Sequence, residues 1–227
     1  MNTPTPHLDT ALLVIASAYP AGFCANMAAL IRPARDGRRG DSLSGDLAGF
    51  LAGYAAIVLV VALARPQQVL AFDLPASWLL FPLAPVVGIA CILSEYLMGI
   101  LIFLARTRKL VTRVAVHGSY SGVSRIGVQD VLYIVALVIG EELVLRQLLY
   151  RLLADDLAMT PWAAIATCTI AYGVNHVNFG LTSVVSKLAS GLLYVLLFVF
   201  SGLSIGVVIV AHVTQNLALL ALSRARS

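Results

Sequence analysis

Two adjacent glutamates and an arginine lie inside an apolar stretch that runs from Asp130 to Arg151. The twenty residues between these two ends span about 30 Å as an α-helix, which is the thickness of one bilayer core. Glu141 and Glu142 are the eleventh and twelfth of them, so both carboxylates are predicted near the membrane midplane. An ionisable side chain there costs roughly 2.5–3.5 kcal/mol on insertion scales and usually has a functional role. The stretch is therefore the first candidate for a reactive site.

Helix geometry distinguishes the two carboxylates. Glu142 and Arg146 are four residues apart, so they share a helix face and can form an ion pair. Glu141 is rotated by about 100° from Glu142 and has no basic residue one turn away in the helix. One carboxylate is thus expected to be neutralised locally, and the other to be available for proton transfer. The alternative is that the ion pair only joins helices, with Glu141 a bystander.

Two histidines lie in later apolar runs, each one helical turn from another polar side chain. Tyr172 and His176 are four residues apart, and so are His212 and Asn216, which places each pair on one helix face. His212 is the tenth residue of the predicted span 203–222, so it too lies near the midplane. A single intramembrane histidine is usually a hydrogen-bonded core residue. Two of them at the depth of a Glu-Glu pair indicate a shared site.

The composition is that of an integral membrane protein. Of the 227 residues, 60% are hydrophobic and 11% are charged, against roughly 25% charged in a soluble domain. We therefore expect an all-α fold, a polytopic transmembrane helix bundle. The net charge is +4, but the arginines cluster in short loops, which is typical of membrane orientation signals, and no nucleic-acid partner is expected. About seven spans are predicted, at 10–31, 47–64, 76–105, 130–151, 161–178, 182–201 and 203–222.

The polar ends and loops bear on topology. Residues 1–9 contain no Lys or Arg, so they lack the basic region of a cleaved signal peptide, and the first span is expected to be retained. The distribution of Lys and Arg among the loops places the N-terminus outside and the C-terminus in the cytoplasm. Thr160 before Pro161 predicts a helix N-cap followed by the first helical residue. We expect one membrane domain, with N-terminal spans and basic loops over 1–125 and a four-helix core over 126–223.

Other chemically capable side chains are isolated. Cys24, Cys91 and Cys168 each lie in an apolar run with no CxxC spacing and no neighbouring histidine, so all three are expected to pack as small apolar residues. Glu95, within the third span, is expected either to be hydrogen-bonded inside the bundle or to support the site. His117 is expected in the loop after that span, away from any ligand set.

Together these residues resemble the CPBP intramembrane proteases, a family that includes the CAAX prenyl endopeptidases and the bacteriocin-processing and immunity proteins. The family pattern EExxxR, FxxxH and HxxxN, each on its own transmembrane helix, is matched here over about 137–220. Tyr172 stands where phenylalanine is usual, which keeps the ring and adds a hydroxyl. Each motif alone is unspecific, but three in order on separate hydrophobic helices are specific. They read Glu141-Glu142-Leu-Val-Leu-Arg146, Tyr172-Gly-Val-Asn-His176 and His212-Val-Thr-Gln-Asn216.

The resemblance implies an intramembrane glutamate protease that hydrolyses a peptide bond of a membrane-associated protein or peptide. Glu141 would be the general base, acting with His176 on the attacking water. His212 and Asn216 would hold the oxyanion of the tetrahedral intermediate. This agrees with the chemistry, because fixed donors aimed at an oxyanion act strongly in a site that excludes water. The residues implied as structural support are Glu142, Arg146 and Tyr172.

The same side chains leave a metal-dependent alternative open. Glu141, His176 and His212 could bind Zn²⁺, which takes three protein ligands and a water molecule in catalytic sites. The sequence lacks the HExxH signature of a zinc protease. We favour the metal-free mechanism, so no cofactor is expected, and zinc is the alternative.

Two further functions share these features. The chain could be a catalytically inactive immunity or scaffold protein, or a small proton-coupled transporter, since midplane Glu and His side chains can relay protons. The lack of a visible inverted repeat argues against the transporter. Family relatives process prenylated C-termini, bacteriocin leaders or C-terminal sorting tails. The alanine-rich chain looks bacterial, so we expect an inner-membrane protein whose substrate is a sorting tail or leader peptide rather than a prenylated protein.

Overall fold

A computed structural model describes residues 6–20, 22, 24, 43–66, 71–109 and 127–224. Within these ranges the regular elements are all helices and no β-strand occurs, which confirms the expected all-α class. The α-helices are α1 (Pro6–Ala18), α3 (Leu43–Ala64), α5 (Leu80–Thr107), α6 (Val128–Glu142), α7 (Leu149–Arg151), α8 (Pro161–Val174), α9 (Leu181–Phe200) and α10 (Ile205–Arg224). The π-helical segments are η1 (Leu143–Leu148) and η2 (Leu152–Asp156), and η3 (Val177–Phe179) is a 3₁₀ turn.

Three of the described helices are long and apolar enough to cross a membrane. They are α5, α9 and the part of α10 from Ile205 to Leu222. Two shorter apolar helices lie at Ala48–Ala64 and Pro161–Val174. The all-helical membrane fold is therefore as expected, and the number of seven spans stays a prediction.

Several element ends differ from the sequence prediction. The first span was predicted over 10–31 with a kink at Pro20 and Gly22; α1 ends at Ala18, and the described residues Pro20, Gly22 and Cys24 are again helical. A proline restricts the residue before it to extended conformations, which favours a helix end here. Residues 25–42 and the loop 110–126, which contains His117, lie outside the described residues.

Helix α8 begins where its cap sequence predicted. The Thr160 side chain accepts a hydrogen bond from the Ala163 backbone N–H at 3.4 Å, and Pro161 is the first helical residue. A hydroxyl cap satisfies one of the unpaired N–H groups of a first turn, and proline at this position loses no hydrogen bond. The C-terminal end was predicted at 178, whereas α8 ends at Val174. The final residues of that prediction therefore lie in a turn.

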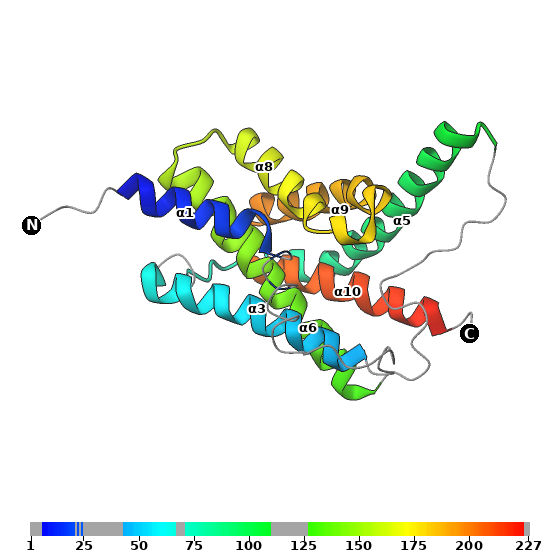
Figure 1. Ribbon diagram of the computed structural model, residues 1–227, viewed down its shortest axis with the longest axis horizontal. Helices are drawn as coiled ribbons and strands as arrows, with labels where there is room; N and C mark the ends of the chain where they lie inside the picture. Colours follow the sequence, from blue (N-terminus) through cyan, green and yellow to red (C-terminus); the bar gives the residue numbers. More distant parts are fainter. Residues whose placement is uncertain are drawn as a thin grey trace, which may run out of the picture.

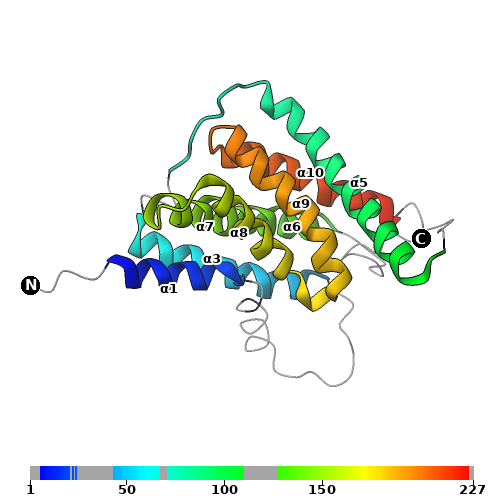
Figure 2. The ribbon, with the colours of Figure 1, turned by 90° about the horizontal axis from the view of Figure 1, so that it is seen from above.

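Helix α6 and the π-helical segments that follow it run through the middle of the bundle (Figure 1). Helix α3 packs on one side of α6, and α10 packs against it as well. Helix α5 packs against α9 and α10, and α8 packs against α9. Figure 2 shows the resulting layers, with α1 and α3 on one side, α6 and α8 in the middle, and α9, α10 and α5 on the other. Polar groups on α6 can therefore meet partners from both flanking layers.

The segment after Glu142 leaves α-helical geometry. Residues Leu143–Leu148 form π-helical turns, and all of the side chains from Val144 to Leu148 are buried. A helix that buries only one face cannot bury five consecutive side chains. This segment is therefore enclosed on all sides. The sequence predicted a regular α-helix here. π-Helical turns of this kind are rare and often lie at functional sites.

Two ion pairs hold the end of the acidic segment. Arg65, just after α3, pairs with Asp156 at 2.7 Å and donates to the Thr10 hydroxyl on α1 at 3.1 Å. Arg151 pairs with Asp73, in the extended segment before α5. These contacts join four parts of the chain at one end of the central helix.

Candidate active site

Glu142 lies at the centre of a buried ion pair. Its Oε1 accepts a hydrogen bond from Arg146 Nη1 at 3.2 Å, and the two side chains are 0% and 1% exposed. This confirms the pair predicted from the four-residue spacing. The same oxygen accepts from His212 Nδ1 at 2.6 Å. Two groups that carry or can carry a positive charge therefore contact one oxygen of this enclosed carboxylate, which offsets part of the cost of burying its charge.

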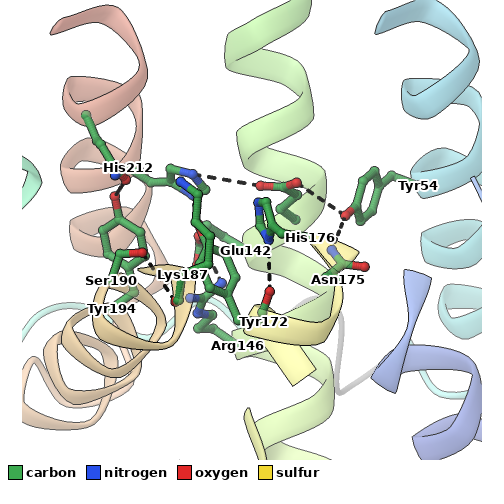
Figure 3. A network of polar contacts seen from close by, with 12 residues as sticks. Tyr54, Glu142, Arg146, Tyr172, Asn175, His176, Lys187, Ser190, Tyr194 and His212 are labelled. Atoms are coloured by element: carbon green, nitrogen blue, oxygen red, sulfur yellow. Dashed lines mark hydrogen bonds and ion pairs between the residues drawn. The ribbon is translucent and has the colours of Figure 1, made fainter. Parts of the chain in front are cut away.

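Glu141 differs from Glu142 in exposure and in partners. Its side chain is 21% exposed, and its Oε2 lies 3.8 Å from His212 Nε2. Its Oε1 accepts a hydrogen bond from the Tyr54 hydroxyl at 3.4 Å. His212 and Tyr54, which contact different oxygens of Glu141, lie at opposite sides of the polar network in Figure 3. Glu141 is therefore the carboxylate that an entering molecule can reach, and His212 lies between the two acids.

His176 follows the end of α8 rather than lying on the helix. Its Nδ1 lies 2.9 Å from the Tyr172 carbonyl oxygen. Since a carbonyl oxygen only accepts, Nδ1 carries the hydrogen, and Nε2 of the neutral ring is left as an acceptor. The Tyr172 and His176 ring centroids are 4.9 Å apart. The four-residue spacing thus brought the two side chains together, although a turn and not a helix holds His176.

Aromatic rings enclose the Arg146 guanidinium. Its carbon lies 4.4 Å from the Tyr172 ring centroid and 5.4 Å from that of Tyr194. A cation over aromatic faces at this range is stabilised by the ring quadrupoles. Tyr194 also stacks on His212, with centroids 4.8 Å apart and planes 29° from parallel. Aromatic rings therefore pack against both partners of Glu142, Arg146 and His212.

The motif that runs from His212 to Asn216 contains a buried residue that the sequence analysis did not single out. Asn216, predicted to act with His212, is half-buried, whereas its neighbour Gln215 is fully buried. Gln215 accepts a hydrogen bond from the Tyr194 hydroxyl and donates to Glu95 Oε1 at 2.8 Å. The same oxygen of Glu95 accepts from Lys187 Nζ at 2.8 Å. Glu95 is therefore hydrogen-bonded inside the bundle and reaches the site through two further side chains.

Sequence reasoning missed several polar residues around the site. Lys187 is a cation within an apolar span, and the rule that intramembrane charges are functional would have found it. Gln215 lies within the motif that runs from His212 to Asn216, but it was not predicted as a site residue. Tyrosine and asparagine residues in apolar helices do not by themselves indicate a functional site, because their contacts depend on how the helices pack. The residues missed are Tyr54, Asn175, Lys187, Tyr194 and Gln215.

The zinc alternative requires three protein ligands at one point. Among the described residues, no three His, Cys, Asp or Glu side chains lie together as a metal site. The Nδ1 atoms of both histidines contact acceptors within the protein, that of His212 with Glu142 and that of His176 with a carbonyl, so the Nε2 atoms are the ring nitrogens left to face other groups. We therefore derive no catalytic step through a metal.

A family model matches part of the chain. Residues 127–218 match the family described as Type II CAAX prenyl endopeptidase Rce1-like. This segment is an Rce1-like domain. The match covers less than half of the chain, and it relates this segment to a family of membrane-embedded proteases. Comparisons with curated proteins and with solved structures gave no match.

The Rce1-like domain contains every predicted site residue, but the site also draws on helices outside the matched range. Tyr54 comes from α3 and Glu95 from α5, both before residue 127. Their contacts reach Glu141 and, through Gln215 and Tyr194, His212. The N-terminal helices therefore complete the surroundings of the domain's polar groups.

Removal of the Tyr172 hydroxyl is expected to stabilise the protein. This hydroxyl is buried and has no hydrogen-bond partner among the described residues, and such a group costs about 1–3 kcal/mol. Tyr172→Phe keeps the ring beside Arg146 and should raise the free energy of unfolding by about 1 kcal/mol with unchanged activity. Thermal unfolding in detergent measures this. Tyr194→Phe is the matched control, because its hydroxyl donates to Gln215, and it should lower stability. A destabilised Tyr172→Phe variant would contradict the prediction.

Proposed function

We propose that the protein is an intramembrane endopeptidase that hydrolyses a peptide bond of a membrane-associated protein or peptide. This proposal rests on one observation: the two adjacent carboxylates differ in exposure and in pairing. Glu142 is enclosed and paired with Arg146, whereas Glu141 is 21% exposed and lies 3.8 Å from His212. A base must be reachable by water and substrate, and only Glu141 of the two meets this condition. Membership of the Rce1-like family supports the same activity.

In the proposed reaction, Glu141 activates a water molecule, with His176 as a second acceptor. One O–H bond of the water breaks and the proton passes to Glu141. The water oxygen forms a bond to the peptide carbonyl carbon, and the carbonyl π electrons move to its oxygen. Collapse of this tetrahedral intermediate breaks the C–N bond, and the proton held by Glu141 passes to the leaving amine. General base and acid catalysis by one carboxylate is consistent with its position beside an imidazole.

His212 and Asn216 are proposed to bind the oxyanion. As an imidazolium, His212 would donate from Nδ1 to Glu142 and from Nε2 to the oxyanion. Two carboxylates, Arg146 and such an imidazolium balance in charge, so no net charge is left in the apolar interior. Glu142, Arg146 and Tyr172 then support the site by holding His212 in place. Preorganised donors of this kind contribute most where water is excluded.

The proposed mechanism needs no metal, and this can be measured directly. Protein purified without chelators should contain no stoichiometric zinc by inductively coupled plasma mass spectrometry, and hydrolysis should persist in EDTA. The expectation follows from the proposed reaction, in which the Glu141 carboxylate itself activates the water. One zinc per chain together with loss of activity in EDTA would support the metal-dependent alternative.

The proposed location is the bacterial inner membrane, with the N-terminus outside and the C-terminus cytoplasmic. The proposed substrate is a C-terminal sorting tail or a leader peptide. Comparative terminal proteomics of a Glu141→Ala strain against wild type tests the function, and at least one membrane protein should keep an untrimmed terminus in the variant. If all termini are unchanged while the Glu141→Ala protein is lost from the membrane, the scaffold function is favoured instead.

A further inference from the structure

Helix α3 lies outside the Rce1-like domain, yet it presents a side chain to the candidate general base. Tyr54 is 1% exposed, and its hydroxyl reaches Glu141 Oε1 at 3.4 Å. A second polar group faces the same hydroxyl, because Asn175 Nδ2 lies 3.0 Å from the Tyr54 oxygen. Asn175 directly precedes His176, so the contact joins α3 to the turn that holds the histidine. Figure 3 shows Tyr54 and Asn175 next to each other, joined by this contact.

The chemistry of these groups fixes the direction of the hydrogen bonds. An amide nitrogen can only donate, so the Tyr54 oxygen accepts from Asn175. The hydroxyl hydrogen of Tyr54 is then left to donate, and Glu141 Oε1 is the acceptor it faces. A carboxylate accepts such a bond more strongly than a neutral oxygen does. The chain of donors therefore runs from Asn175 through Tyr54 to Glu141.

A glycine allows this approach. Gly140 directly precedes Glu141, and a Cβ at this position would lie 2.9 Å from Tyr54 Cβ. Since this is closer than non-bonded carbons come in proteins, any larger residue at 140 would push α3 away from α6. Small residues at membrane helix interfaces permit such close contact. The glycine beside the base thus sets the distance at which the tyrosine reaches it.

We propose that Tyr54 is a positioning residue that orients the Glu141 carboxylate, an inference that rests on the proposed function. Tyr54 holds Oε1, and the opposite oxygen, Oε2, faces His212 Nε2 at 3.8 Å. The two oxygens then have different roles. Oε2 takes the proton from water, while Oε1 stays bonded to the tyrosine. The family match begins at residue 127 and does not include this residue.

The first test does not depend on catalysis. Dicyclohexylcarbodiimide, an apolar reagent that reacts with protonated carboxyl groups, is applied to the full chain in detergent, and peptide mass spectrometry quantifies the adduct at Glu141. A carboxylate that loses a hydrogen-bond donor binds a proton more readily, so Tyr54→Phe should raise the labelling rate about tenfold. Tyr150→Phe is the matched control, because Tyr150 is also buried, packs edge-on against Phe198 and should label as wild type does. Equal labelling of the two variants would overturn the inference.

The second test measures hydrolysis of the peptide identified by terminal proteomics. Tyr54→Phe should lower kcat about tenfold with KM within twofold of wild type, because orientation acts on the chemical step. Gly140→Ala should lower kcat as well. Combined with Tyr54→Phe it should cause no further loss, since both act through one hydrogen bond. Additive losses would indicate a general packing defect and overturn the inference.

The two measurements separate the inference from the proposed function. Faster labelling in Tyr54→Phe with no hydrolysis by the wild type would reject the endopeptidase and keep the role of Tyr54 at Glu141. Hydrolysis that Tyr54→Phe leaves unchanged would reject the role of Tyr54 and keep the endopeptidase. If Tyr54→Phe lowers the melting temperature, Gly140→Ala with the hydroxyl intact must still raise labelling for the inference to stand.

Discussion

Glu141→Gln is expected to reduce hydrolysis about 10³-fold and to leave the fold intact, which is within the range for loss of a general base. Glutamine has the same shape as glutamate, and its carbonyl oxygen can still accept from the Tyr54 hydroxyl. It cannot take a proton from water. Because Glu141 is 21% exposed and lies 3.8 Å from His212, whereas Glu142 is enclosed against Arg146, neutralisation of Glu141 should disturb the fold less than that of Glu142. The measurement is kcat on the substrate peptide, together with the melting temperature in detergent.

The matched control for this experiment is Glu142→Gln. That change leaves the buried Arg146 without its carboxylate, so it should lower the melting temperature as well as the activity. The two adjacent substitutions thus separate a role in chemistry from one in folding. If Glu141→Gln kept more than a tenth of the wild-type kcat, Glu141 would not be the general base. If it unfolded the protein, the scaffold function would be favoured.

Arg146→Met is expected to be among the most destabilising substitutions in the chain. It leaves the 0%-exposed Glu142 carboxylate without its guanidinium partner, and removal of one member of a buried pair costs about 3–5 kcal/mol. The contacts of Arg146 with the Tyr172 and Tyr194 rings are lost as well. The melting temperature in detergent should fall by roughly 10 °C for a protein of this size.

Two control variants make this prediction specific. Glu142→Gln combined with Arg146→Met removes both charges and should recover much of the lost stability, because the cost comes from the unpaired carboxylate. Arg65→Met breaks a pair in which the side chains are 26% and 23% exposed, so it should cost less than about 1 kcal/mol. An Arg146→Met variant as stable as Arg65→Met would show that the buried pair contributes little.

The sequence predicted the parts of the site that depend on local geometry. The pairing of Glu142 with Arg146 follows from a spacing of four within one segment. The approach of His212 to these acids followed from a second inference, that ionisable groups at one depth in a membrane must face each other rather than lipid. The contact of Tyr172 with His176 also followed from spacing.

The parts that escaped prediction depend on packing between distant segments. The end of α8 at Val174 placed His176 in a turn, and no residue type marks that end in the sequence. Tyr54 meets Glu141 only because α3 lies against α6 at Gly140. The glycine is visible in the sequence, but its partner helix is not. Long-range contacts of this kind require the three-dimensional arrangement, whereas periodicity reports on one helix at a time.

The central segment, which contains the π-helical turns, cannot gain or lose a residue without moving one of its ends relative to its partners. Glu142 at one end faces Arg146 and His212, while Asp156 at the other end faces Arg65. Deleting one residue between these ends would rotate everything beyond the deletion by about 100°, so the two ends could no longer meet their partners together. Insertions and deletions in natural relatives should therefore be confined to the connecting loops, and the spacing from the second acid to the aspartate should be kept even where the residues between them differ.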